Sequence, residues 1–218
     1  MKILDVPRSG SYQGITSSRN RFGQYVRSRA TPVNPRSSFQ GAVRDRLSLN
    51  ATAWRSLTAI QRAGWESLGA QIQRTDSLGQ TYTLNGFSAY CLTNNNNLAA
   101  GNVVVSDAPT WASPAGLTTA TITLTAAAFS IAYTVTPLAA GARLFAFASA
   151  PTSAGRSFGQ DQRLIQVSAA AAASPLDIFT AYETRMGVPT VGSAVFIALQ
   201  VYLGGFTSGP LLKRQIVA

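Results

Sequence analysis

The sequence predicts an α+β protein in three parts: an extended basic N-terminal arm (1–36), a small helical module (37–102) and a C-terminal antiparallel β-sandwich (109–218). Prolines fall at 7, 32 and 35 and then not again until Pro109. Long uninterrupted helices therefore fit best between Pro35 and Pro109. From Thr119 onward the apolar residues recur with a period of two, which is typical of strands. Positive charge is concentrated at one end, because residues 1–75 hold 12 Lys and Arg against three acids.

The arm combines Gly10, Gly14 and Gly23 with many serines and shows no helical period. Thr31 and Asn34 each precede a proline, which favours extended backbone. We expect irregular or extended structure with one short strand at 24–29. An arm with so few apolar residues is expected to order only against a partner.

The arm is rich in arginine, whose planar guanidinium suits fixed contacts with carboxylates, phosphates and aromatic rings. Three interpretations fit it: docking on neighbouring protein subunits, a clamp for nucleic acid, and a solvated basic surface. Protein assembly is favoured because lysine is scarce and the paired prolines fix a path for the chain. The candidate partner-binding residues are Arg19, Arg21, Phe22, Tyr25, Arg27, Arg29, Pro32, Pro35, Arg36 and Arg44.

Helical spacing begins at Ser37, which with Gln40 forms a capping-box pattern. A second such pattern, Thr58 with Gln61, predicts a fresh helix start after Leu57. The apolar positions of the first helix are Phe39, Val43, Leu47, Ala51 and Trp54.

Trp54 and Trp65 are expected to belong to the core of the helical module. A loop over 75–84 should lead to a third helix capped by Asn85 and ended at Gly101. We expect Cys91 on this helix to be a small buried hydrophobe. The run of asparagines at 94–97 predicts an exposed polar face or a ragged helix end.

Six short strands are predicted in the last 100 residues, which is the number that a β-sandwich needs. A short helix over 176–187 interrupts them, with Ile178, Tyr182 and Arg185 at helical spacing and Gly187 as its end. The predicted strands are 119–124, 129–136, 143–150, 163–169, 195–203 and 211–217.

Several classes of chemistry lack sequence support. There is no histidine and a single cysteine, Cys91, which removes His-dependent triads, His-ligated metals and internal disulfides. No two acids are three or four residues apart, and no glycine-rich phosphate motif is present. We therefore expect neither an enzyme, nor a cofactor, nor a metal site. The N-terminus lacks a signal-peptide pattern, and the longest apolar run, 191–206, is too short to span a bilayer.

The segment from about 20 to 100 resembles a family of mostly uncharacterised phage and prophage structural proteins. The shared pattern is R-x-R-x-T-P-x-N-P, then Q-x-x-V-R, then W-x-x-L-T-x-x-Q-R-x-x-W, then G-F/L-x-x-Y. It falls on Arg27, Arg29, Thr31, Pro32, Asn34, Pro35, Gln40, Val43, Arg44, Trp54, Leu57, Thr58, Gln61, Arg62, Trp65, Gly86, Phe87 and Tyr90. Beyond Pro109 the resemblance is to fibronectin type III or immunoglobulin-like sandwiches in general.

The resemblance implies a non-enzymatic virion protein, associated with a capsid or tail, that forms homo-oligomers and contacts other virion proteins. Nucleic-acid binding through the arm is the alternative. A second alternative, a glycan-binding virion domain, rests on exposure of aromatic residues such as Trp111 or Tyr202.

Overall fold

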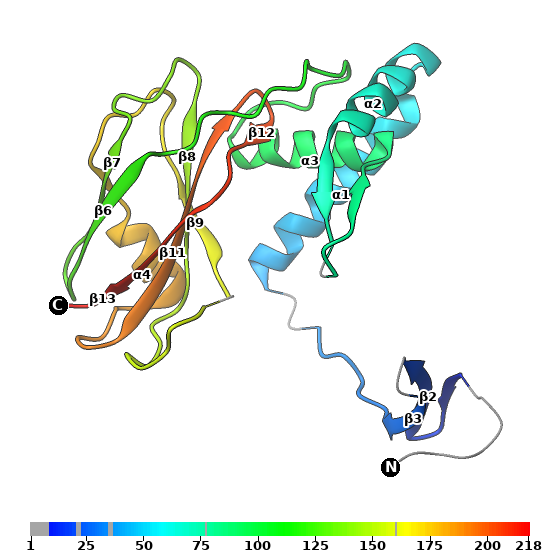
Figure 1. Cartoon of the computed structure of the whole chain (residues 1–218), viewed down its shortest axis with the longest axis horizontal. Coiled ribbons are helices and arrows are strands. Elements are labelled where there is room, and N and C mark those ends of the chain that lie inside the picture. The colour runs from blue at the N-terminus through cyan, green and yellow to red at the C-terminus, as the bar shows by residue number, and fades with distance from the viewer. Residues whose placement is uncertain (1–8, 21–22, 35–36, 77, 160) are drawn as a thin grey trace. The chain divides into compact units, whose positions relative to one another are not determined.

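The computed structural model describes residues 9–20, 23–34, 37–76, 78–159 and 161–218. The chain is a mixed α+β protein with four helices and several small antiparallel sheets in this described part. It divides into two compact units, residues 1–42 and 43–218 (Figure 1). None of the helices within the described ranges is long and apolar enough to cross a membrane.

The arm begins with a three-stranded antiparallel sheet, hereafter the meander: β1 (Gly10–Tyr12), β2 (Ile15–Asn20) and β3 (Gly23–Ser28). Of the expected irregular or extended structure, the three strands show the extended form, and β3 confirms the predicted short strand, but their pairing into a sheet was not predicted. The first turn places Gln13 in a left-handed conformation (φ 50°) followed by Gly14. Serine and threonine fill the strands where apolar residues usually alternate, so the period-two pattern is weak in the sequence.

Residues 29–34, after the meander, have no regular secondary structure and are exposed. This agrees with the extended backbone that the X-Pro steps favour. We call residues 29–37 the tether, because they join the meander to the first helix.

The helical module holds α1 (Ser38–Ser56), α2 (Ala59–Gln71) and α3 (Gly86–Ala99). The backbone N–H of Gln40 donates to Ser37 Oγ (3.3 Å), and Thr58 with Gln61 forms a complete capping box. Asn85 caps α3 through the Ser88 N–H (2.7 Å). All three predicted helix starts are confirmed.

The segment expected to be a loop contains a hairpin, formed by β4 (Gln73–Thr75) and β5 (Thr81–Thr83). Asp76 shapes its turn, because its side chain accepts hydrogen bonds from the Leu78 and Gln80 N–H groups. The strands are too short and too polar for their pattern to stand out in the sequence.

The core of the module forms around Tyr90 of α3. Trp65 contacts it edge-on, with ring centroids 5.0 Å apart, and Trp54 lies at 5.3 Å. Trp65 is fully buried and Trp54 half-buried, so both indoles belong to the core as predicted. Cys91 is only half-buried, less than expected.

The C-terminal region contains two antiparallel sheets, and all six predicted strands are present. One sheet has the order β10-β7-β6, and the other has the order β12-β11-β8-β9 with β13 also paired to β11 (Figure 1). The predicted helix is α4 (Phe179–Met186), followed by Gly187. The strands are β6 (Thr119–Leu124), β7 (Phe129–Thr134), β8 (Arg143–Ala148), β9 (Arg163–Val167), β10 (Leu176–Asp177), β11 (Ala194–Leu203), β12 (Phe206–Thr207) and β13 (Leu211–Ile216).

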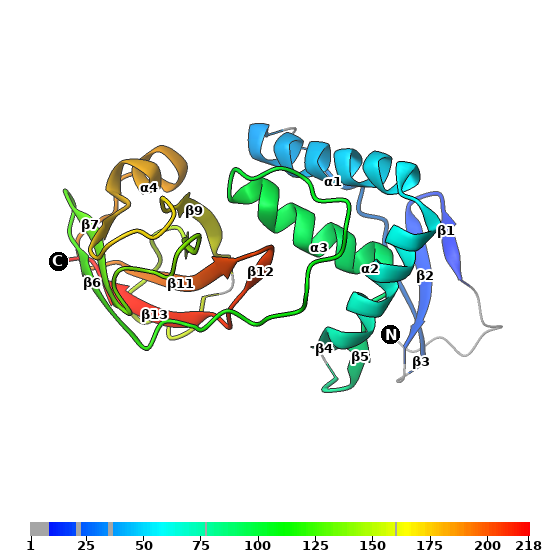
Figure 2. The ribbon, with the colours of Figure 1, turned by 90° about the horizontal axis from the view of Figure 1, so that it is seen from above.

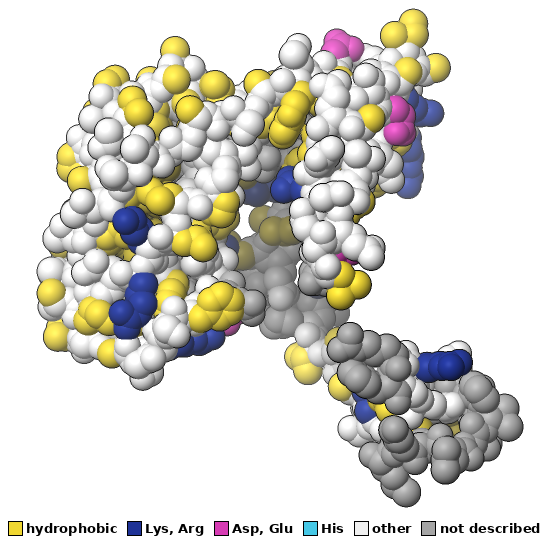
Figure 3. Space-filling view, in the orientation of Figure 1, with side chains coloured by type: hydrophobic (Ala, Val, Ile, Leu, Met, Phe, Trp, Pro, Cys, Tyr) yellow, Lys and Arg dark blue, Asp and Glu magenta, His cyan; other side chains and the backbone are white. Residues whose placement is uncertain are grey.

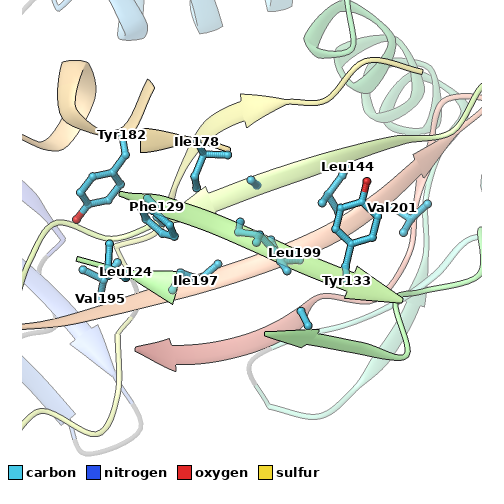
Figure 4. Packing of buried hydrophobic residues seen from close by; sticks show 14 of the residues in the cluster. Leu124, Phe129, Tyr133, Leu144, Ile178, Tyr182, Val195, Ile197, Leu199 and Val201 are labelled. Atoms are coloured by element: carbon cyan, nitrogen blue, oxygen red, sulfur yellow. The ribbon is translucent and has the colours of Figure 1, made fainter. Parts of the chain in front are cut away.

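The two sheets share one apolar core, to which α4 contributes Tyr182 (Figure 4). Phe129 of β7 meets Tyr182 edge-on, with ring centroids 5.1 Å apart, and both are fully buried. Ile197 and Leu199 of β11 face the same core, to which every strand except β12 contributes side chains, whereas Phe206 of β12 packs in the core of the helical module. We call these two sheets with α4 the sheet pair.

The asparagine run of α3 is not an exposed face, which corrects the prediction. Asn94 and Asn97 are buried, and Asn94 bonds both backbone groups of Val105 (2.8 and 3.1 Å). Asn97 accepts from the Tyr202 hydroxyl (2.7 Å), and Asn96 donates to the Gly205 carbonyl (2.9 Å). The amides of Asn96 and Asn97 thus form hydrogen bonds with groups at the end of β11 and in the turn after it. The helix α3 therefore contacts the sheet pair through polar side chains. Figure 2 shows α3 beside α1 and reaching the turn before β12.

Candidate assembly interface

The meander has two different faces, which its register defines. Directly opposite residues of antiparallel strands point to the same side, and side chains alternate along each strand. Tyr12 pairs with Ile15, and Ser17 pairs with Val26, so these four side chains share one face. Ser11, Thr16, Ser18, Tyr25 and Arg27 share the other.

The first of these is the apolar face of the meander, defined by Tyr12, Ile15 and Val26. Their exposed fractions are 72%, 48% and 39%. A hollow of about 260 Å³ lies beside Tyr12 and Ile15, where the small residues Gly10 and Ser17 leave room. These residues were not identified from the sequence. Tyr12 and Ile15 lie on either side of a turn, and neither stands in a run of apolar residues.

The second face is basic and aromatic, and it carries Tyr25 and Arg27. Arg29 continues it, since its N–H donates to the Gly14 carbonyl (2.8 Å) and the period of two places it on the same side as Arg27. Their spacing of two in the sequence already indicates that Arg27 and Arg29 lie on one side of an extended segment. Arg19 is separated from them, because it pairs with Gln24 and shares the side of Ile15.

The three arginines Arg19, Arg27 and Arg29 are exposed. Their side chains form no ion pair or hydrogen bond with any residue that the structure describes. Residues 1–42 carry seven basic residues against Asp5, a net charge of +6. The face that holds Arg27 and Arg29 is thus open to an acidic or phosphate-bearing partner.

The other predicted residues are distributed along the chain. Pro32 is exposed in the tether, and Arg44 lies exposed on α1, outside the arm. The predictions for Arg21, Phe22, Pro35 and Arg36 fall outside the described residues.

The first half of α1 forms a second exposed apolar surface. Val43 and Leu47, here called the α1 stripe, are 64% and 50% exposed and lie four residues apart on one side of the helix. The same side continues through Asn50 and Trp54, where it packs against the rest of the module. The spacing of the apolar residues predicts an apolar side of the helix. It does not show that the first half of α1 extends beyond the elements that cover its second half.

The residues proposed for glycan stacking are not exposed. Tyr202 is 2% exposed, stacks on Phe145 and holds hydrogen bonds with Asn97 and Asn102 (2.7 and 2.8 Å). Trp111 is half-buried and packs edge-on against Phe206, with centroids 4.7 Å apart. The exposure on which the glycan alternative rested is therefore absent at Tyr202 and only partial at Trp111.

Reactive groups give no further site. Within the described ranges, no three Cys, Asp or Glu side chains gather in a way that could hold a metal ion. Burial raises the pKa of the Cys91 thiol, which lowers its thiolate fraction and its reactivity. The outer surface of the sheet pair is mostly uncharged in the view of Figure 3.

The chain was compared with models of protein families, with curated proteins and with solved structures, and nothing in any of the three sets matches it.

Proposed function

We propose that the protein is a non-enzymatic structural component of a phage-type virion, in which the N-terminal arm docks on or between neighbouring subunits. The observation that carries the proposal is the meander, an ordered sheet with no buried side chain in its described part and with an exposed apolar face. Ordering backbone costs about 1–2 kcal/mol per residue, which apolar burial must offset. A partner surface that covers this face would provide that burial.

The sheet pair fits the role of a displayed fibronectin type III-like module. Its strands form the two antiparallel sheets that such sandwiches have, with β6, β7 and β10 in one and β8, β9, β11 and β13 in the other. A surface with few charges suits packing against other virion proteins. The resemblance of residues 20–100 to phage structural proteins supports the same assignment.

The test is to induce particles in the cell that carries the gene, purify them on a density gradient and probe them for this chain. The proposal predicts that the chain sediments with the particles. An arm variant with Arg19, Arg27 and Arg29 changed to Gln should be lost from them, whereas a control with Arg55, Arg74 and Lys213 changed to Gln should be retained. A chain that stays in the particle-free fractions would contradict the proposal.

Nucleic-acid binding is the second candidate, supported by the common face of Tyr25, Arg27 and Arg29. An aromatic ring beside two cations on one face is an arrangement on which single-stranded bases stack and phosphates are neutralised. Fluorescence anisotropy with a labelled single-stranded oligonucleotide tests it. Two phosphate contacts, from Arg27 and Arg29, predict a slope of log affinity against log salt of about −1.4. Equal affinity for wild type and Tyr25→Ala, without salt dependence, would remove this candidate.

A further inference from the structure

The sheet pair has an apolar pocket at the end where β7 connects to β8. Its volume is about 140 Å³, and among the described residues only apolar side chains and glycine line it. Leu138, Ala142 and Val201 are the buried residues of this lining. Val135 and Leu203 line it too and are 59% and 38% exposed. An apolar cavity of about 150 Å³ accommodates benzene, so the pocket has room for one aromatic ring.

Phe158 presents an aromatic ring to solvent in the loop between β8 and β9, where it is 64% exposed. Arg214 of β13 holds this loop, since its Nε donates to the Arg156 carbonyl (3.0 Å), and Arg156 Nε donates to the Phe158 carbonyl (2.7 Å). The next residue, Gly159, lies so close to the ring of Phe196 that a Cβ there would overlap it. The backbone around Phe158 is therefore held by specific contacts, while its ring stays exposed.

One chain cannot place Phe158 in its own pocket. Leu203, which lines the pocket, is the last residue of β11. The Phe158 loop contacts the other end of this strand, because Gly159 packs on Phe196. Leu203 and Phe196 are seven residues apart, or about 23 Å along an extended strand. Figure 1 likewise shows the loops before and after β8 at opposite ends of the sheet pair. The ring can therefore reach such a pocket only in another molecule.

A second copy is the partner that these two features favour. The chain itself supplies both a ring and a pocket of matching size and chemistry, so identical copies are complementary without a further protein. Charge opposes the contact only weakly, because residues 109–218 hold six basic and three acidic residues, a net charge of +3 against +10 for the whole chain. No described residue that lines the pocket is charged.

We propose that Phe158 of one copy inserts its ring into the apolar pocket of a second copy. The contact is heterologous, because different surfaces of the two copies meet. Repetition of the contact builds a ring of subunits if the rotation closes and a filament if it does not. This inference goes beyond the proposed function, because the contact lies within the sheet pair and does not involve the arm.

The experiment is sedimentation velocity on the full chain over a range of concentrations, and wild type should self-associate. Phe158→Ala removes the ring, and Ala139→Leu fills the pocket from an exposed residue of its lining. Each change should lower the association constant at least about tenfold, which is the effect of losing one buried aromatic side chain. An equimolar mixture of the two variants should form a species of two chains and nothing larger, since one intact ring and one intact pocket remain.

Three matched controls test specificity. Tyr82→Ala removes an exposed aromatic ring from β5, and Ala140→Leu adds the same bulk as Ala139→Leu at an exposed neighbour outside the pocket lining. The third control is the arm variant with its three arginines changed to Gln. All three should associate like wild type. Circular dichroism of every variant shows whether it is folded.

A second measurement keeps both the ring and the pocket. In a Cys91→Ser background, chains with Ser157→Cys, beside the ring, are mixed with chains with Ala139→Cys, at the pocket, and oxidised. The proposal predicts mixed disulfide dimers in excess of all dimers between like chains together. Equal amounts would overturn it.

Three further results would also overturn the inference: a monomeric wild type, a mixture of Phe158→Ala and Ala139→Leu chains that stays monomeric, or a tenfold or greater loss of association in any control. A monomeric wild type would leave another protein or a small apolar molecule as the occupant of the pocket. Because the particle assay depends on the arm, failure here with retained particle binding would leave the proposed function in place. Absence from the particles with intact self-association would have the reverse meaning.

Discussion

The sheet pair and the meander are both antiparallel sheets of short strands, yet they differ in what they bury. In the sheet pair, Phe129 and Ile197 are fully enclosed between two sheets. In the described part of the meander no side chain is buried, and Tyr12 is 72% exposed. The same strand geometry is thus self-sufficient in one region and dependent on a partner in the other. Charge is also unevenly distributed, since residues 1–42 carry +6 of the total net charge of +10.

The largest difference should appear when one apolar side chain is truncated in each region. Phe129→Ala removes a fully buried ring beside Tyr182 and should lower the free energy of unfolding by about 3–5 kcal/mol. Ile15→Ala in the monomer should change it by less than about 0.5 kcal/mol. Urea unfolding followed by circular dichroism measures both. Similar losses for the two variants would show that the meander has a core of its own.

The contact between α3 and the sheet pair offers a test with a neighbouring control. Gly205 has φ +92°, and a Cβ placed there would lie 2.4 Å from Thr93 Cγ2. Gly205→Ala should therefore lower the free energy of unfolding by about 2–4 kcal/mol, from overpacking and backbone strain together. Gly204→Ala has strain (φ +58°) but free space, and should cost about 1 kcal/mol. Equal effects would indicate that α3 does not pack closely on this turn.

Asn94 tests whether amides fix α3 against the segment that follows it. Asn94→Ala leaves the partly buried N–H and carbonyl of Val105 without the partner they have now, so we expect a loss of about 1–3 kcal/mol in the free energy of unfolding. Thr52→Ala on the exposed side of α1 should change it by less than about 0.5 kcal/mol. Thermal unfolding of both variants makes the comparison, and a neutral Asn94→Ala would contradict the buried role.

The smallest effect is a pH dependence of the sheet pair. Burial raises the pKa of Tyr182 from about 10 to about 12, so the folded state keeps the proton that the unfolded state loses. This contribution is fully present below pH 10 and is lost as the pH rises from 10 through 12. At about pH 11 the wild type should have lost about 1 kcal/mol more than Tyr182→Phe, measured by urea unfolding. Parallel pH profiles for the two proteins would refute this origin.

Local sequence patterns predicted the elements whose ends or faces are determined by residues close together in the sequence. Capping residues such as Thr58 and Asn85 gave correct helix starts, because a side chain bonds a backbone N–H three residues on. Six of the eight strands of the sheet pair were predicted within a few residues from their alternating or β-branched apolar residues, and the two-residue strands β10 and β12 were not predicted. Gly187 ended α4 as expected.

Patterns failed where long-range contacts decide the structure. The burial of Asn94 and Asn97 depends on Val105 and Tyr202, which the spacing within α3 does not reveal. Only β3 of the meander was predicted, because β1 and β2 contain few apolar residues and show no period of two. The α1 stripe has the spacing of a core helix, and only the extent of its neighbours shows that Val43 and Leu47 are exposed.

Hydrogen exchange of the full chain, read by mass spectrometry in the free and particle-associated states, tests the dependence of the arm on a partner most directly. In the free, dilute chain, the amides of β2 and β3 should exchange near unprotected rates, while those of β11 should be protected by several orders of magnitude. On association, protection should appear in β2 and β3. Strong protection of β2 and β3 in the free monomer would contradict the account.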